Sequence, residues 1–115
     1  MALTKGQLTE IEQAAAKYMY YHRPPMKVRD QLDFGYRIDG QNVHLFEIRP
    51  QWDKPEVKTE TPVAKTTYIK SKHLWKIYWM RGNLKWYHYE PVPFVKTISD
   101  FFDLVAEDEL SCFFG

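Results

Sequence analysis

Two runs of alternating aromatic residues on either side of Gly82-Asn83 constrain the fold of this chain more than any other feature. Glycine adopts a positive φ at little cost and asparagine tolerates one, so this dipeptide favours a two-residue turn. The pattern predicts a β-hairpin over residues 74–90. Counting outward from the turn places Trp79 opposite Trp86, a cross-strand aromatic pair worth about 0.2–1 kcal/mol more than an alanine pair.

This register divides the hairpin into an apolar face and an amphipathic face, because side chains alternate between the two sides of a strand. The apolar face, which we assign to the core, carries Trp75, Ile77, Trp79, Leu84, Trp86 and His88. The amphipathic face carries Lys76, Tyr78, Met80, Lys85, Tyr87 and Tyr89. On this assignment His88 is a core histidine whose ring nitrogens find hydrogen-bond partners. The amphipathic face is either a second packed surface or a binding surface.

Length, charge and cysteine content set the class of protein. The 115 residues fit a single domain, residues 1–115, that can bury a core without disulfides. Sixteen Lys and Arg against fifteen Asp and Glu leave a net charge of +1, which neither favours nor excludes nucleic acid. The single cysteine cannot form an internal disulfide, and the chain shows no signal peptide and no stretch of ~20 apolar residues. We therefore expect a cytoplasmic protein with no membrane partner.

Two amphipathic helices are predicted, one near each end of the chain. Thr4 is a candidate N-cap for a helix over residues 4–22, which Pro24-Pro25 ends. Thr97 resembles the start of a capping box for the second helix, with an acidic residue three positions later. That helix is expected to bury Ile98, Phe101, Phe102 and Val105. The basic connector at residues 22–29 is either a solvated loop or a phosphate-contacting loop.

Three further strands precede the aromatic hairpin. Asp39-Gly40 predicts a turn between two of them, within residues 34–49, and Val63–Lys70 reads as the third. The residues expected to share one face of the first pair are Phe34, Tyr36, Ile38, Val43, Leu45 and Glu47. Short connections favour antiparallel pairing. The predicted fold is α+β, with an N-terminal helix, a five-stranded antiparallel β-meander, a C-terminal helix and one layer of helices on one sheet face.

Two remaining segments carry aromatic residues outside these elements. Residues 50–61 form a long loop interrupted by prolines, and we expect its Trp52 to dock against the body. The apolar tail at residues 111–115 is expected to pack back onto the domain. Within that tail Cys112 is expected to be a small buried hydrophobe rather than a reactive thiol.

Several strings in order along the chain resemble a known family. They are Ile48–Asp53, Val63–Lys65, Trp75–Arg81, Leu84–Trp86 and Cys112–Gly115. Together they resemble a family of short bacterial proteins that is filed as a domain of unknown function, family 3024. The resemblance covers nearly the whole chain and implies a free-standing bacterial domain. It implies no activity, cofactor or catalytic residue.

No motif for catalysis or for a cofactor is present. The five glycines form no phosphate-binding loop, there is no nucleophile elbow, and the four histidines are spread over different elements. We therefore expect no cofactor and no metal site. Glu47 is the most interesting carboxylate, because a buried carboxylate needs a cationic partner, and Arg49, Lys65 or Arg81 could supply one. A weaker hypothesis is a metal-dependent hydrolase or nuclease that uses Glu47, Asp53 and Lys65.

The amphipathic face is the stronger functional hypothesis. Lysines interleaved with tyrosines offer cations to phosphates and ring faces to bases, which single-stranded nucleic acid requires. The predicted ligand-binding residues are Lys76, Tyr78, Arg81, Lys85, Tyr87, Tyr89 and Arg49. We expect a binding protein rather than an enzyme, with single-stranded nucleic acid or another anionic ligand as its partner. The alternatives are an ordinary solvated sheet face and a homodimer that forms through the same face.

Overall fold

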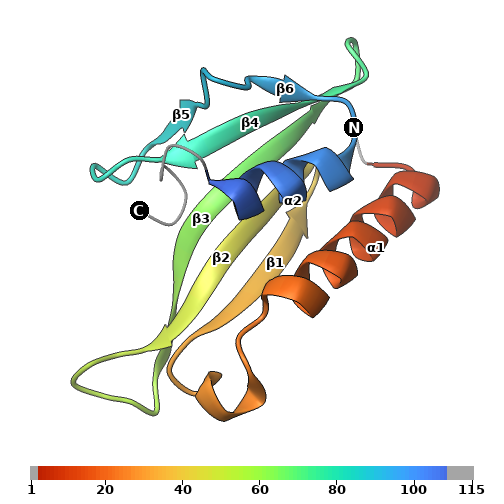
Figure 1. The fold of residues 1–115 in the computed structure, drawn as a ribbon. Coiled ribbons are helices and arrows are strands. Elements are labelled where there is room, and N and C mark those ends of the chain that lie inside the picture. The colour runs from red at the N-terminus through yellow and green to blue at the C-terminus, as the bar shows by residue number, and fades with distance from the viewer. Residues whose placement is uncertain (1–2, 109–115) are drawn as a thin grey trace.

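A computed structural model describes residues 3–108 and shows the predicted α+β fold, with both helices on the same side of one sheet (Figure 1). The elements are α1 (Lys5–His22), a 3₁₀ helix η1 (Met26–Val28), β1 (Asp33–Asp39), β2 (Asn42–Pro50), β3 (Lys58–Ile69), β4 (Leu74–Met80), β5 (Trp86–His88), β6 (Phe94–Val95) and α2 (Ile98–Glu107). Strands β1 to β5 follow one another across the sheet as a meander. The two-residue β6, which the sequence pattern does not predict, pairs with β4 on the same edge as β5.

Both helices start at the predicted caps. The Thr4 hydroxyl accepts from the Gln7 N–H at 3.1 Å, and the Gln7 side chain accepts from the Thr4 N–H at 2.9 Å, which completes a capping box. Thr97 accepts from the Asp100 N–H at 3.1 Å at the start of α2. These bonds satisfy N–H groups that a helix start leaves without partners.

The core lies between the helices and one face of the sheet. Its fully buried members include Ile11 of α1, Leu45 of β2, Ile77 of β4 and Phe101 of α2. The predicted apolar face of α2 is confirmed, since Ile98, Phe101, Phe102 and Val105 are all buried. Truncating a side chain such as Phe101, which has no exposed surface, costs about 3–5 kcal/mol in comparable cores.

The first hairpin has the predicted faces, although its turn lies one residue later. Asp39 pairs with Asn42, so Gly40 and Gln41 form the turn, and Gly40 has a φ of +61°. Moving a two-residue turn by one position shifts the register by two, and the side chains stay on the same faces. Ile38 therefore still shares its face with Val43.

The aromatic hairpin has a different register from the predicted one. Trp79 pairs with Tyr87, not with Trp86, and Met80 pairs with Trp86. The loop is three residues long, because Leu84 takes a left-handed conformation with a φ of +63° and the Arg81 N–H bonds to the Lys85 carbonyl at 3.2 Å. The register therefore differs by one residue, which moves every β5 side chain to the other face.

The loop after β2 is shorter and more exposed than predicted. Strand β3 begins at Lys58, so the β2–β3 hairpin projects from the body (Figure 1). Pro62 is tolerated within β3 because it lies beside the bulge at Leu45/Phe46, before the stretch that pairs with β4. The prediction that Trp52 docks is wrong, since this side chain is 94% exposed on the projecting loop.

The basic connector is held to the body by polar contacts. The Arg23 guanidinium donates two hydrogen bonds of 2.8 Å to the Asp33 carboxylate, and the Arg29 Nε–H donates to the Pro24 carbonyl at 2.8 Å. The pKa of Asp33 is lowered, chiefly by the hydrogen bond from Arg23. The predictions for Cys112 and the apolar tail lie outside the described residues. Neither α1 nor α2 is both long enough and apolar enough to cross a membrane.

The loop geometry predicts different effects for two glycine substitutions, at Leu84 and at Gly82. Leu84→Gly should raise the free energy of unfolding by about 1 kcal/mol, because a left-handed conformation costs most residues roughly 1–2 kcal/mol and glycine little. Gly82→Ala should change it by less than about 0.5 kcal/mol, since Gly82 has no positive φ and an added Cβ meets nothing within 4 Å. Urea unfolding measures both. If Gly82→Ala lowered the free energy of unfolding strongly and Leu84→Gly left it unchanged, the result would contradict the three-residue loop and favour the two-residue turn.

Candidate nucleic-acid interface

One face of the sheet carries no helix among residues 3–108, and we call it the open face. Strand register places a single row of side chains across it, one from each of β1 to β5. This cross-strand row consists of Arg37, His44, Lys65, Tyr78 and His88. Because directly paired residues lie on the same side of a sheet, the row is a continuous strip of cationic and aromatic groups.

Cation–ring contacts join the row to the neighbouring side chains. The Lys65 Nζ lies 4.5 Å from the ring centroid of Tyr78 and 5.1 Å from that of Trp86. The Lys76 Nζ lies 5.4 Å from the Tyr78 centroid. The His88 ring is 5.6 Å from Tyr78, and the His44 ring is 6.1 Å from Trp86. Each contact between a lysine and a ring contributes about 0.5–2 kcal/mol, depending on how far it is shielded from water.

The electrostatics of the row follow from partial burial. The pKa of Lys65 is lowered by burial. The pKa of His44 is also lowered, first by burial and then by the nearby charge of Lys65, so this ring is neutral at pH 7. A neutral imidazole can both donate and accept a hydrogen bond.

A shallow hollow of about 110 Å³ lies at the β1–β3 side of the open face. It is lined by Arg37, His44, Leu45, Phe46, Glu60 and Pro62. The Arg37 guanidinium lies 5.0 Å from the Phe46 ring centroid and donates to both Glu60 oxygens, at 2.9 and 3.0 Å. The β-bulge at Leu45/Phe46 shapes this hollow, since it changes the strand pairing at that point.

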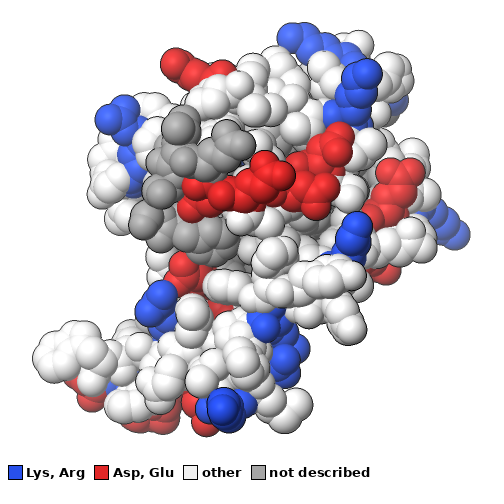
Figure 2. All heavy atoms as spheres, in the orientation of Figure 1, with Lys and Arg blue, Asp and Glu red and all other residues white. Residues whose placement is uncertain are grey.

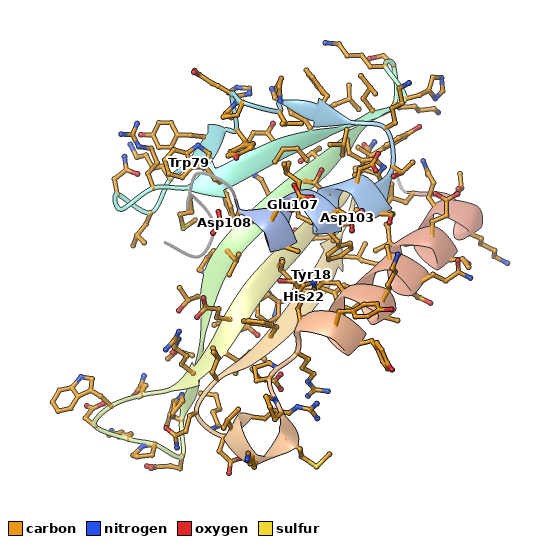
Figure 3. All side chains as sticks on the ribbon, viewed as in Figure 1. Tyr18, His22, Trp79, Asp103, Glu107 and Asp108 are labelled. Atoms are coloured by element: carbon orange, nitrogen blue, oxygen red, sulfur yellow. The ribbon has the colours of Figure 1, made fainter. Side chains whose placement is uncertain are left out.

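The opposite side of the molecule carries acidic side chains. Figure 2 shows Asp and Glu gathered over α2, and Figure 3 labels three of them, Asp103, Glu107 and Asp108. Asp103 and Glu107 are exposed. An anionic ligand is therefore repelled by this part of the helix side.

The predicted ligand-binding residues do not all lie together. Lys76 and Tyr78 lie on the open face, as predicted. The one-residue register difference puts Tyr87 on the helix side of the sheet, and Tyr89 is buried with 2% of its surface exposed. Lys85 is exposed and directly follows the three-residue hairpin loop.

Arg81 and Tyr87 belong to a second location, at the end of the hairpin. The Arg81 guanidinium lies 4.9 Å from the Tyr87 ring centroid and 5.7 Å from that of Trp79. A cavity of about 400 Å³ is lined by Trp79, Arg81, Tyr87, His88, Tyr89, Glu90 and Pro91. Arg81 therefore contacts rings on the helix side of the sheet, and His88 is the member of the cross-strand row that also lines this cavity.

The catalytic candidates are not brought together. Glu47 is 14% exposed and pairs with Arg49 at 2.8 Å, which confirms the predicted ion pair and occupies Arg49. The pKa of the Tyr18 hydroxyl is raised, first by burial and then by the nearby charges of Glu47 and Asp108. Tyr18 points toward the sheet from α1 (Figure 3). Lys65 lies on the open face and Asp53 on the projecting loop. Within residues 3–108 no group of three His, Cys, Asp or Glu side chains could hold a metal ion.

Sequence reasoning missed four side chains of the open face. The two-residue turn assigns Trp86 and His88 to the core, whereas the structure places them on the open face, with His88 exposed. Arg37 and His44 are absent from the predicted site, although alternation along their hairpin places both opposite its apolar face. That alternation is the signal that could have identified them.

Comparison with known families gives a match over nearly the whole chain. A family model described as a domain of unknown function, DUF3024, matches residues 3–115. No curated protein and no solved structure matches the chain. The family match supplies no activity.

The cross-strand row predicts how His44 titrates. Lys65→Gln should raise the pKa of His44 part of the way back to its ordinary value, because burial is the larger cause of the shift. Proton–nitrogen NMR of the imidazole ring measures this. Lys17→Gln, an exposed charge change on α1, is the matched control and should leave the pKa unchanged.

The same shift affects stability. Between the lowered pKa of the folded state and the ordinary value of 6.5, the unfolded chain binds more protons at His44 than the folded protein does. The free energy of unfolding should therefore fall as the pH drops below about 6.5, and less so in His44→Gln. Urea unfolding at several pH values, with equal pH dependence in both proteins, would contradict this.

Proposed function

We propose that this chain, which belongs to the DUF3024 family of domains of unknown function, binds single-stranded nucleic acid on the open face of its sheet. The observation that carries the proposal is the cross-strand row, in which cations and aromatic rings follow one another across five strands. Adjacent strands lie about 4.8 Å apart, so the row is roughly 20 Å long. This length accommodates several nucleotides.

The two kinds of side chain have separate roles in the proposal. Lys65 and Lys76 contact phosphates, because neither is paired with a carboxylate within the described residues. Tyr78, Trp86 and His88 are partly or fully exposed and offer ring surface to bases. A stacked base contributes about 1–3 kcal/mol and shows little sequence preference, since every base has a π face.

Two other functions compete for the same residues. The half-buried Met80, Trp86 and Phe94 on the open face would also suit a homodimer interface. A small anion held by Lys65 and Lys76 alone would need no aromatic surface. The interleaving of rings with cations favours nucleic acid over both.

A cytoplasmic location is part of the proposal. The single cysteine of the chain supports a reducing compartment. The resemblance to short bacterial proteins supports a bacterial source. Both statements are compatible with access to RNA and to single-stranded DNA.

Matched tyrosine variants test the stacking surface. Tyr78→Leu should weaken binding of a mixed-sequence single-stranded oligonucleotide roughly tenfold or more, measured by fluorescence anisotropy. Tyr87→Leu lies on the same hairpin but on the opposite side of the sheet, so it should leave the affinity within about twofold. Equal losses in both variants would contradict the assigned face. Absence of binding at low salt, together with a concentration-dependent mass by light scattering, would identify a homodimer interface instead.

Salt dependence tests the interaction of the lysines with phosphates. Removing one lysine that binds a phosphate should reduce the slope of log affinity against log salt by about 0.7 for a single strand. Lys76→Gln should show this reduction, and Lys17→Gln on α1 should not. If Lys76→Gln left the slope of log affinity against log salt unchanged, Lys76 would not contact a phosphate.

A further inference from the structure

Strands β5 and β6 lie end to end along one side of β4 and form an edge of the sheet (Figure 1). The Ile77 carbonyl accepts from the Tyr89 N–H at 3.0 Å, and the Ile77 N–H donates to the Pro93 carbonyl at 2.9 Å. The hydrogen-bonded ladder along β4 therefore continues from β5 into β6, and residues 90–92 loop out between them. Side chains of β5 and β6 that share a face consequently lie in one line beside β4.

Three aromatic side chains on the open face occupy this line, and we call them the edge column. The column consists of Trp86, His88 and Phe94, whose partners on β4 are Met80, Tyr78 and Lys76 respectively. Because these partners are spaced two residues apart on β4, the backbone positions of successive rings lie about 6.6 Å apart. Bases within a stacked strand lie about 3.4 Å apart. The edge column therefore suits bases that have separated from one another.

Uncompensated lysines accompany the edge column. The Lys72 Nζ lies 4.8 Å from the ring centroid of Phe94, which Lys76 directly opposes on β4. The Lys65 Nζ lies 5.1 Å from the Trp86 centroid. Among residues 3–108 none of these lysines forms an ion pair with a carboxylate. Lys72 is exposed, and a contact of this kind in water is weaker than a stacked base. A base can therefore displace the ammonium from the Phe94 ring and leave the lysine to bind a phosphate.

The two ends of the edge column differ in the direction of their cations. At one end, the Arg81 guanidinium lies 4.9 Å from the ring centroid of Tyr87, on the helix side of the sheet. At the other end, the Lys72 and Lys76 ammonium groups lie beside rings of the open face. A strand that turns out of the cross-strand row is therefore drawn toward Phe94.

We infer that the nucleic acid turns at His88 from the cross-strand row into the Phe94 end of the edge column, an inference that rests on the proposed function. This path selects flexible single strands whose bases stack weakly, such as thymidine or uridine runs. His88 belongs to both the row and the column, which are roughly perpendicular because the row crosses the strands and the column follows β4. A duplex, with a persistence length of about 50 nm, does not follow such a turn. Adenosine runs stack on themselves more strongly, so separating their bases costs more.

Decathymidylate and decaadenylate test this path by fluorescence anisotropy. The unaltered protein should bind decathymidylate roughly fivefold more tightly than decaadenylate, because stacking strength and backbone flexibility set such preferences. Phe94→Leu should weaken the binding of decathymidylate roughly tenfold, the loss expected for one stacked base. Tyr87→Leu removes a ring of the same edge from the helix side, so it should leave the affinity within about twofold. Lys72→Gln should reduce the slope of log affinity against log salt by about 0.7.

The outcomes separate this inference from the proposed function. If Phe94→Leu bound decathymidylate as tightly as the unaltered protein while Tyr78→Leu bound it weakly, the row would stand and the path to Phe94 would be wrong. Equal affinity for the two decamers would overturn the selection of weakly stacking strands, and no binding of either would overturn both proposals. NMR of the unaltered protein needs no variant, since decathymidylate should shift the backbone amides of Lys72 and Phe94. A titration that shifts only the amides of His44 and Lys65 would also overturn the path to Phe94.

Discussion

Two helices cover one face of the six-stranded sheet, and the other face has to remain stable in water. Burial of residues such as Phe101, Ile77 and Leu45 beneath the helices supplies the main stabilisation. An antiparallel sheet permits this asymmetry, because its hairpin connections do not require helices on both sides. The side chains that the strands direct to the uncovered side determine the composition of the candidate site.

On the open face, cationic side chains lie against aromatic rings and cover part of their surface. Lys65 is partly buried, which lowers the pKa of its amine, yet it lies against both Tyr78 and Trp86. Contacts of this kind recover about 0.5–2 kcal/mol each and cover ring surface that would otherwise contact water. In the proposed function the same arrangement supplies the phosphate and base contacts. The side chains that stabilise the uncovered face are therefore the ones to which we assign nucleic-acid binding.

The candidate site is only partly predictable from the sequence. Alternation within β4 is local, so it places Lys76 and Tyr78 on the correct face without any tertiary information. Trp86 and His88 are misplaced because a three-residue loop replaces the two-residue turn that Gly82-Asn83 favours. The Arg37–Glu60 pair could not be predicted, since it spans β2 and depends on a bulge that shifts the register of β3.

Local chemistry in the sequence determined the helices, their caps, the buried stripe of α2 and the order of the strands. These features depend on neighbouring residues and on short connections, which a linear sequence displays. Only the tertiary structure decided the face of β5, the exposure of Trp52 and the hollow at Glu60. Each of these depends on contacts between distant segments. The face of β5 illustrates the reason, because a one-residue change in loop length exchanges its buried and open sides. In the observed register Tyr89 is buried in the core.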